Sequence, residues 1–208
     1  MKFQLTKGEG EFLVGLARRA TEEYVRSRNA ISMPEDTPNR LTRPSGVFVT
    51  INLLENRKKR LRGCIGYPYQ STRLAQAVVE CAISAATHDP RFPPLHPEEL
   101  SKIVFEVSVL TPPELVTVES PKDLPSNIKV GRDGLIIERG PYKGLLLPQV
   151  ATEQGWDEEA FLSNCCIKAG LAPDSWLLNR TKIYRFQATV FEEEKPRGEV
   201  RRRTFGGG

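Results

Sequence analysis

The residues best suited to chemistry lie in the stretch KKRLRGCIGYPY, residues 58–69, where a thiol stands between two glycines. On a β-strand alternate side chains share a face, so Arg62 and Cys64 should lie side by side, on the face opposite the apolar Leu61. A guanidinium next to a thiol stabilises the thiolate, which is the reactive form of cysteine. Cys64 is therefore a candidate catalytic nucleophile, with Arg62 as the group that activates it.

The glycines at positions 63 and 66 can be interpreted in two ways. Because they have no side chain, Gly63 and Gly66 let a ligand approach the backbone, which makes them candidate ligand-binding residues. They equally let a second backbone pack closely, with Cys64 as a small buried apolar residue, and free cysteine is among the most buried residue types. The pattern leaves ligand binding and packing both open and favours packing.

A second group of polar residues lies in THDPRFPPLHP, residues 87–97, a turn stiffened by prolines. Asp89 and Arg91 are candidate ligand-binding residues, and His88 could act as a base toward Cys64. Ordinary turn chemistry accounts for the same residues, with Asp89 capping the turn and Arg91 paired with a nearby carboxylate. The spacing alone favours the turn.

Glu106 is a further candidate ligand-binding residue, because it interrupts the otherwise apolar pattern IVFEVSVL, residues 103–110. A carboxylate there belongs either to a pocket or to an exposed face. The matching position in the second half of the chain is the uncharged Gln187. We therefore expect any asymmetric chemistry to lie in the first half.

The composition indicates a soluble globular protein, since 39% of the 208 residues are hydrophobic and 27% are charged. No apolar run approaches the roughly 20 residues of a bilayer-spanning helix. The first residues, MKFQLTKGEGEF, lack the apolar core of a secretory signal, so we expect a cytoplasmic protein that contacts no membrane. The cysteines and histidines show no CxxC or HxxxH spacing, and we expect neither a metal nor a cofactor.

The net charge of +4 is concentrated in two segments, because residues 55–62 and residues 195–203 each carry +4 and the remainder carries −4. Neither segment interleaves aromatic with basic residues, as stacking surfaces for nucleic acid do. Weak nucleic-acid binding through these segments is therefore the least favoured function. Residues 195–208 lack periodicity and end in three glycines, which predicts a flexible basic tail.

The spacing of apolar residues predicts an α+β fold with a mostly antiparallel sheet and an N-terminal helix that begins with a Thr6–Glu9 capping box. Two stretches, 46–111 and 130–192, each follow the order strand, strand, helix, strand. They align at several positions, such as Cys81 with Cys165, which predicts an internal duplication. Strands are expected at 46–54, 61–66, 103–110, 133–139, 143–149 and 182–191, and helices at 6–30, 71–89 and 157–171.

Six blocks, GVFVT, LRGCIG, DPRFPPL, EVSVL, GLLLPQVA followed by GWD, and KAGL, resemble the AMMECR domain family. The family is named after a human protein of the Alport syndrome, midface hypoplasia and elliptocytosis chromosomal region. The blocks occur in order over about residues 8–194, so we expect residues 1–194 to form a single domain of this type. LRGCIG, residues 61–66, is the hallmark of the family.

The resemblance implies a fold of two intertwined, repeated halves, with a cleft near the hallmark hexapeptide that is suspected of being a functional site. It implies no reaction, because the family lacks an established activity. Some microbial relatives are encoded with, or fused to, a Memo-type protein and a radical-SAM protein, which implies a shared pathway or complex. His88 lies outside the family block, which weakens a pairing of His88 with Cys64.

Two functions fit these residues about equally well. In a binding module, the hexapeptide backbone together with Arg62 and Arg91 would hold an anionic small molecule or an acidic segment of a protein partner. In an enzyme, Cys64 would attack a substrate held by the neighbouring charged residues. The sequence identifies neither the ligand nor the partner, and it leaves the oligomeric state open.

Overall fold

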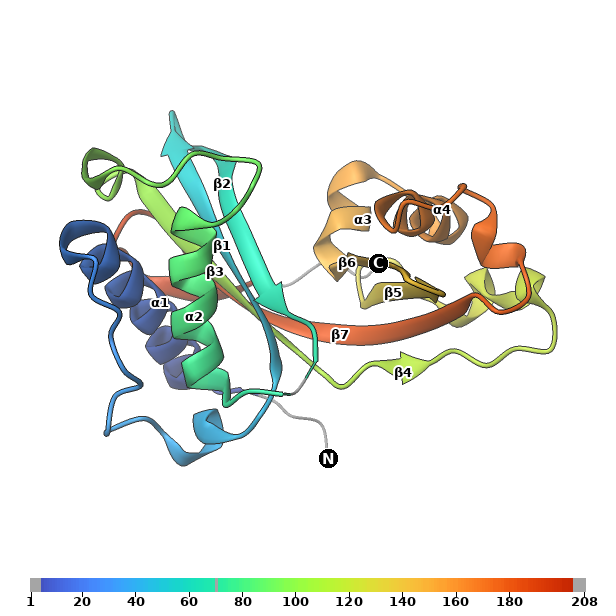
Figure 1. The fold of residues 1–208 in the computed structure, drawn as a ribbon, viewed down its shortest axis with the longest axis horizontal. Helices are drawn as coiled ribbons and strands as arrows, with labels where there is room; N and C mark the ends of the chain where they lie inside the picture. Colours follow the sequence, from blue (N-terminus) through green and yellow to red (C-terminus); the bar gives the residue numbers. More distant parts are fainter. Residues whose placement is uncertain (1–4, 70, 204–208) are drawn as a thin grey trace. The chain divides into compact units, whose positions relative to one another are not determined.

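The computed structural model describes residues 5–69 and 71–203 and has an α+β fold (Figure 1). Within this part of the chain, none of the helices has the length and apolar character that a bilayer crossing requires. The helices are α1 (Lys7–Ser27), α2 (Leu74–Thr87), α3 (Pro148–Gln154) and α4 (Glu158–Lys168). The strands are β1 (Gly46–Glu55), β2 (Lys58–Tyr67), β3 (Ile103–Leu110), β4 (Glu114–Leu115), β5 (Asp133–Arg139), β6 (Tyr142–Leu146), β7 (Lys182–Glu193) and β8 (Val200–Arg203).

The chain divides into two compact units. The first comprises the described residues up to Leu110 together with Thr189–Arg203, and the second comprises Thr111–Ala188. The first unit is therefore discontinuous in sequence, because β7 contributes its first residues to the second unit and its last residues to the first. This arrangement agrees with the two intertwined halves that the family resemblance implies.

In the first unit, the strands follow the order β2-β1-β3-β7, and β8 also pairs with β7. β1 and β2 form an antiparallel hairpin whose turn residues, Asn56 and Arg57, have φ angles of 50° and 64°. Positive φ angles at both central residues are typical of the tightest hairpin turns. The hairpin contains the two strands expected at 46–54 and 61–66, and β2 begins earlier than expected, because residues 58–60 belong to it.

Helices α1 and α2 cover one face of the sheet of the first unit (Figure 1). The β1 residues Val47, Val49 and Ile51 are fully buried in the apolar core that these helices share with the sheet. The residues between them, such as Thr50, belong to the other face because side chains alternate along a strand. The core therefore fixes which face of the sheet the polar residues of β1 occupy.

In the second unit, the strands follow the order β7-β5-β6, β4 pairs with β7, and α4 packs on β5 and β6. Its own apolar core includes Phe161. Both units pack a helix against a glycine: a Cβ at Gly63 of β2 would collide with the Ala85 carbonyl of α2, and one at Gly144 of β6 would collide with the backbone of α4. In both units two strands are followed by a helical segment and then a strand: β1, β2, α2 and β3 in the first, and β5, β6, α3, α4 and β7 in the second. The internal duplication itself stays a prediction.

Two segments differ from the sequence-based expectation. The pattern predicts a strand over 143–149, but β6 ends at Leu146 and Pro148 begins α3, since a proline ring suits the first turn of a helix. The pattern also predicts a flexible tail over 195–208, but residues 200–203 form β8. That part of the tail prediction is wrong, because ion pairs of its arginines with Glu192 and Glu106 hold the segment in place. Residues 204–208 lie outside the described residues.

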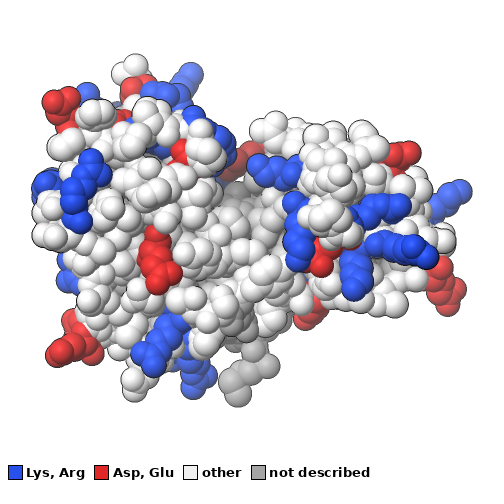
Figure 2. Space-filling model, viewed as in Figure 1, with Lys and Arg blue, Asp and Glu red and all other residues white. Residues whose placement is uncertain are grey.

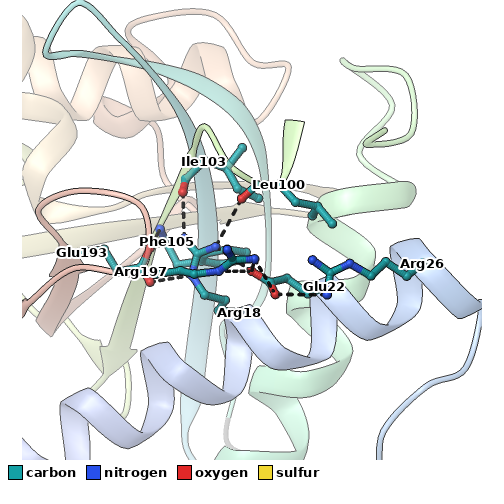
Figure 3. A network of polar contacts seen from close by, with 8 residues as sticks. All are labelled: Arg18, Glu22, Arg26, Leu100, Ile103, Phe105, Glu193 and Arg197. Carbon is teal, nitrogen blue, oxygen red and sulfur yellow. Dashed lines mark hydrogen bonds and ion pairs between the residues drawn. The ribbon is translucent and has the colours of Figure 1, made fainter. Parts of the chain in front are cut away.

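A buried ion pair joins α1 to the end of β7 (Figure 3). Nε and Nη2 of Arg18 donate to the two carboxylate oxygens of Glu193 at 2.7 and 2.6 Å, and the two side chains are only 9% and 4% exposed. Arg18 also donates to the carbonyl of Ile103 at 2.7 Å, and Glu193 accepts the backbone N–H of Phe105 at 3.1 Å. The pair thereby connects three elements of the first unit that are distant in sequence.

We predict that Arg18→Ala lowers the free energy of unfolding by about 3–5 kcal/mol, because it leaves the Glu193 carboxylate buried without its charged partner. Urea unfolding measures this loss. Arg26→Ala is the matched control, since Arg26 is 56% exposed and lies 3.7 Å from Glu22, and such exposed pairs contribute less than about 1 kcal/mol. Equal losses in the two variants would contradict the assignment of Arg18 as the main connection.

Candidate functional site

The hexapeptide lies in β2, at one edge of its sheet. The pairing of β2 with β1 shifts between Ile51 and Asn52, so that Arg62 is an extra residue without a counterpart on β1. Such a β-bulge interrupts the alternation of side chains along the strand. Arg62 and Cys64 consequently contact different parts of the chain, which corrects the prediction that they lie side by side on one face.

Arg62 is buried, and acceptors within the protein occupy its guanidinium. Nε and Nη2 donate to the two carboxylate oxygens of Glu99 at 2.7 and 3.0 Å. Nη1 donates to the carbonyl of Pro93 at 2.9 Å and Nη2 to that of Pro94 at 3.3 Å. Only 7% of the residue is exposed. The structure therefore gives Arg62 a structural role, in place of the predicted activation of Cys64 and contact with an anion.

Asp89 and Arg91 close the open edge of β2 at Cys64. The backbone N–H of Cys64 donates to Asp89 Oδ2 at 2.8 Å, and the Cys64 carbonyl accepts from Arg91 Nη2 at 3.4 Å. Arg91 in turn donates from Nε and Nη2 to the two carboxylate oxygens of Asp89 at 3.0 and 2.7 Å. Two side chains thus satisfy the backbone groups that an edge strand otherwise leaves open. We call this arrangement of Asp89, Arg91 and the Cys64 backbone the edge latch.

The Cys64 thiol belongs to the polar face of the sheet. Thr50 Oγ1 donates to Cys64 Sγ at 3.3 Å, and Glu106 of β3 is the strand neighbour of Thr50. Burial is the main cause that raises the pKa of Cys64, and the negative charges of Glu106 and Asp89 raise it further. The hydrogen bond from Thr50 and the charge of a nearby guanidinium offset only part of this rise. The thiol is therefore protonated at neutral pH, which disfavours a thiolate nucleophile.

Packing accounts for both glycines of the hexapeptide. Gly63 lies against the backbone of α2 at Ala85, and a Cβ at Gly66 would collide with the Phe48 ring and the Val47 carbonyl. Close approach of a second backbone is one of the two roles that the sequence leaves open for these glycines, and it is confirmed for Gly63. Ligand contact through either glycine stays a prediction.

His88 is not brought into a catalytic arrangement with Cys64. Its Nδ1 lies 2.7 Å from Thr87 Oγ1, and the Asp89 carboxylate that could have oriented it is engaged in the edge latch. Among residues 5–69 and 71–203, no group of three or more His, Cys, Asp or Glu side chains is placed to hold a metal ion.

Four residues that the sequence analysis did not single out complete the site, namely Thr50, Phe92, Glu99 and Arg203. The Phe92 ring lies near both guanidinium groups, with its centroid 6.0 Å from Cζ of Arg62 and 5.4 Å from that of Arg91. Thr50 could have been found, because it is a polar residue in an apolar strand and lies on the polar face. Phe92 lies in the block DPRFPPL, next to Arg91, whereas tertiary structure brings in Glu99 and Arg203, which no local pattern signals.

We predict that Asp89 makes stability depend on acid pH. Hydrogen bonds from Arg91 are the main cause that lowers the pKa of Asp89 from 3.8 to about 2. Since the folded-state pKa is depressed, the stabilisation is complete above about pH 4 and is lost as the pH falls through about 2. The shift corresponds to about 2 kcal/mol.

Urea unfolding of the parent chain and of Asp89→Asn between about pH 5 and pH 2 tests this, because the asparagine cannot ionise. The variant should lack that part of the pH dependence. Parallel loss of stability in both proteins would show that the Asp89 charge contributes nothing to the edge latch.

We predict that Cys64 reacts slowly with iodoacetamide at neutral pH, with a midpoint above the roughly 8.5 of a free thiol, since burial and nearby carboxylates disfavour its thiolate. Peptide mass spectrometry resolves the labelling rate of each cysteine. Cys81 and Cys165 serve as internal controls, because burial raises the pKa of each to about 12. Rapid labelling of Cys64 with a midpoint below that of a free thiol would restore the enzyme hypothesis.

The hexapeptide and the edge latch fall within a region of the chain that matches known sequences. Residues 14–191 match the family described as AMMECR1. Protein TK0174 of Thermococcus kodakarensis is 60% identical over 195 residues, which cover 93% of this chain and 95% of that protein. A protein of Methanothermobacter thermautotrophicus is 56% identical over 190 residues, which cover 91% of this chain and 97% of the relative.

A solved structure is also similar to this chain. The crystal structure of the uncharacterized protein PH0010 from Pyrococcus horikoshii has a TM-score of 0.93 and 53% sequence identity, and the match covers 97% of this chain and 100% of that chain. At this identity, sequence and fold agree over nearly the whole length. The α+β fold predicted from the sequence is therefore confirmed.

Proposed function

The chain belongs to the AMMECR1 family, as its sequence blocks predicted, and on that premise we propose that it is a binding module. Its recognition element is Arg91, which holds an acidic segment of a protein partner beside the hexapeptide. Asp89 orients Arg91, and the hexapeptide supplies the rigid strand to which both are attached. The cleft that the family resemblance implies beside the hexapeptide is part of this proposal.

The orientation of Arg91 is the observation that carries the proposal. Nε and Nη2 are fixed by Asp89 and by the Cys64 carbonyl, while Nη1 has no hydrogen-bond partner among the described residues. The side chain is 48% exposed, although the Asp89 side chain beneath it is only 1% exposed. A guanidinium held in one orientation loses little freedom when it binds a carboxylate, which favours recognition.

The enzyme alternative has weaker support. Its two requirements are a cysteine with a low pKa and a nearby base, whereas the pKa of Cys64 is raised and His88 is hydrogen-bonded to Thr87. The same environment suits a cysteine that packs and accepts a hydrogen bond from Thr50. In the proposed function, the backbone of Cys64 positions Asp89 and Arg91, and its thiol takes no part in chemistry.

Nucleic-acid binding also has little support. Six of the ten cations of the two basic segments form ion pairs among the described residues, for example Lys59 and Arg201 with Glu192, and Arg203 with Glu106. On the face that Figure 2 presents, Lys and Arg side chains are scattered over the first unit and lie closer together over the second, with acidic side chains among them. Phosphate binding of useful strength needs several unpaired cations along one surface.

We further propose a cytoplasmic location, which the four free cysteines favour because reducing compartments keep thiols unpaired. The acidic partner belongs, in this proposal, to the same pathway as Memo-type and radical-SAM proteins. That part rests only on the gene association that the family resemblance implies.

The proposal is tested by titrating isotopically labelled protein with a pentaglutamate peptide and following the Cys64 amide and the Arg91 Nε–H by NMR. Both signals should shift, and Arg91→Ala should weaken binding about tenfold, since a charge-assisted bond contributes roughly 1–2 kcal/mol. Arg91→Lys should recover only part of the affinity, because an ammonium lacks the forked geometry of a guanidinium.

The second unit offers a matched control. Arg132 pairs with Asp133 at 2.6 Å with side-chain exposures of 48% and 2%, close to those of Arg91 and Asp89, and neither Arg132 nor Asp133 belongs to the edge latch. Arg132→Ala should leave peptide binding unchanged. If Arg91→Ala binds the peptide as well as the parent chain, or if both variants lose the same affinity, the proposal fails.

A further inference from the structure

The second unit contains a pocket of about 320 Å³ that no function discussed so far uses. It opens where the segment after β4 separates from the segment before β7. The backbone N–H of Val116 still donates to the Ile183 carbonyl at 2.8 Å. Beyond that bond, no backbone hydrogen bond joins residues 117–119 to residues 178–182 within the described chain. The two segments therefore form opposite walls of the pocket.

The walls of this pocket are largely apolar. Val116, Val118, Trp176 and Ile183 line it, and Trp176 is held in place by a hydrogen bond from Nε1 to Ser163 Oγ at 3.2 Å. Leu178, which also lines the pocket, is 47% exposed. Leu115, a second lining leucine, is 53% exposed, so the part of the pocket that faces solvent is also apolar and suits an apolar group of a ligand.

The charged residues that line the pocket have an excess of one positive charge. Arg180, Lys182 and Glu119 line it, and among the described residues none of these three side chains forms an ion pair or a hydrogen bond. Two unpaired cations next to apolar walls favour a ligand that carries a negative group.

The loop that carries Arg180 is fixed by side-chain bonds. Arg139 Nη1 donates to the Asn179 carbonyl at 3.2 Å and to Thr181 Oγ1 at 2.9 Å, and Thr181 Oγ1 donates to the Ser175 carbonyl at 2.7 Å. Arg180 itself has a φ angle of 73°, in the left-handed region that residues other than glycine rarely adopt. Such backbone strain, held by surrounding bonds, is concentrated at ligand sites.

We propose that this pocket binds a small amphiphilic carboxylate. Its apolar part lies against Trp176 and Leu178, and its carboxylate lies at Arg180 and Lys182. The volume is at the lower end of the roughly 300–1,000 Å³ of small-molecule sites, which suits a short chain or single ring and not a large cofactor. This pocket is separate from the site proposed for the acidic partner at Arg91, because none of its lining residues belongs to the edge latch.

Fluorescence of Trp176 tests the proposal in a Trp156→Phe background, where it is the sole tryptophan. Titration with octanoate, the probe, should give a saturating change. The double variant Arg180→Ala/Lys182→Ala should weaken octanoate about tenfold, since it removes both charge-assisted contacts. Glu119→Gln should tighten binding about two- to threefold, because it removes a like charge near the carboxylate.

Controls separate the two parts of the ligand. Octanol should bind more weakly than octanoate and be insensitive to the charge variants, and Lys168→Ala, which removes an exposed lysine of α4, should change nothing. The proposal is overturned if octanoate gives no saturating change. It is equally overturned if the double variant binds octanoate as tightly as the parent, or if only a leucine-ended peptide, and not octanoate, saturates the signal.

Discussion

Arg62 is a buried guanidinium, and a buried guanidinium must find oxygen acceptors for its donors. It finds them in the Glu99 carboxylate and in the carbonyls of Pro93 and Pro94, so the proline-rich segment is drawn against β2. Once that segment is in place, Asp89 and Arg91 can reach the backbone of Cys64 and close the edge of the strand. Two of the six blocks that carry the family resemblance, LRGCIG and DPRFPPL, are thus parts of one structure, in which each requires the other.

Because of this dependence, we assign the role of the hexapeptide to its backbone and not to the Cys64 thiol. A cysteine between glycines suggests chemistry at the thiol, but in this strand the backbone N–H and carbonyl of Cys64 form the hydrogen bonds with Asp89 and Arg91. Gly63 allows α2 to pack closely against β2, and Cys64 offers its N–H and carbonyl to the edge latch. What the arrangement leaves available is one side of Arg91. A comparable arginine–aspartate pair, Arg132 with Asp133, occurs in the second unit. The geometry of such a pair is therefore not specific by itself, and its position beside the hexapeptide is the distinguishing feature.

Local patterns are sufficient to predict the α+β fold, the β1–β2 hairpin and the principal helices, because alternation and capping are properties of neighbouring residues. They cannot predict the β-bulge at Arg62, since an unpaired residue depends on how two strands pair and not on either strand alone. They also cannot predict that Glu99 and Arg203 belong to the site, because both arrive through tertiary contacts. Charge alone places Arg203 in a tail, although the pattern of β3 marks its carboxylate partner, Glu106, as a candidate. The residues of the site are therefore mostly predictable, while their roles are not.

The side chain of Asp89 closes the edge of β2 at Cys64. Native-state hydrogen exchange of the Cys64 amide tests it most directly, with the amide of Phe105, which the buried Glu193 holds, as an internal reference. The Cys64 amide should be strongly protected from exchange in the parent chain despite its edge position. In Asp89→Ala the Cys64 amide should exchange about a hundredfold faster, because it has lost its hydrogen-bond acceptor. The Phe105 amide should change far less, because its acceptor, Glu193, is unchanged. A Cys64 amide that exchanges rapidly in the parent chain, or at the same rate in the variant, would show that Asp89 does not close this edge.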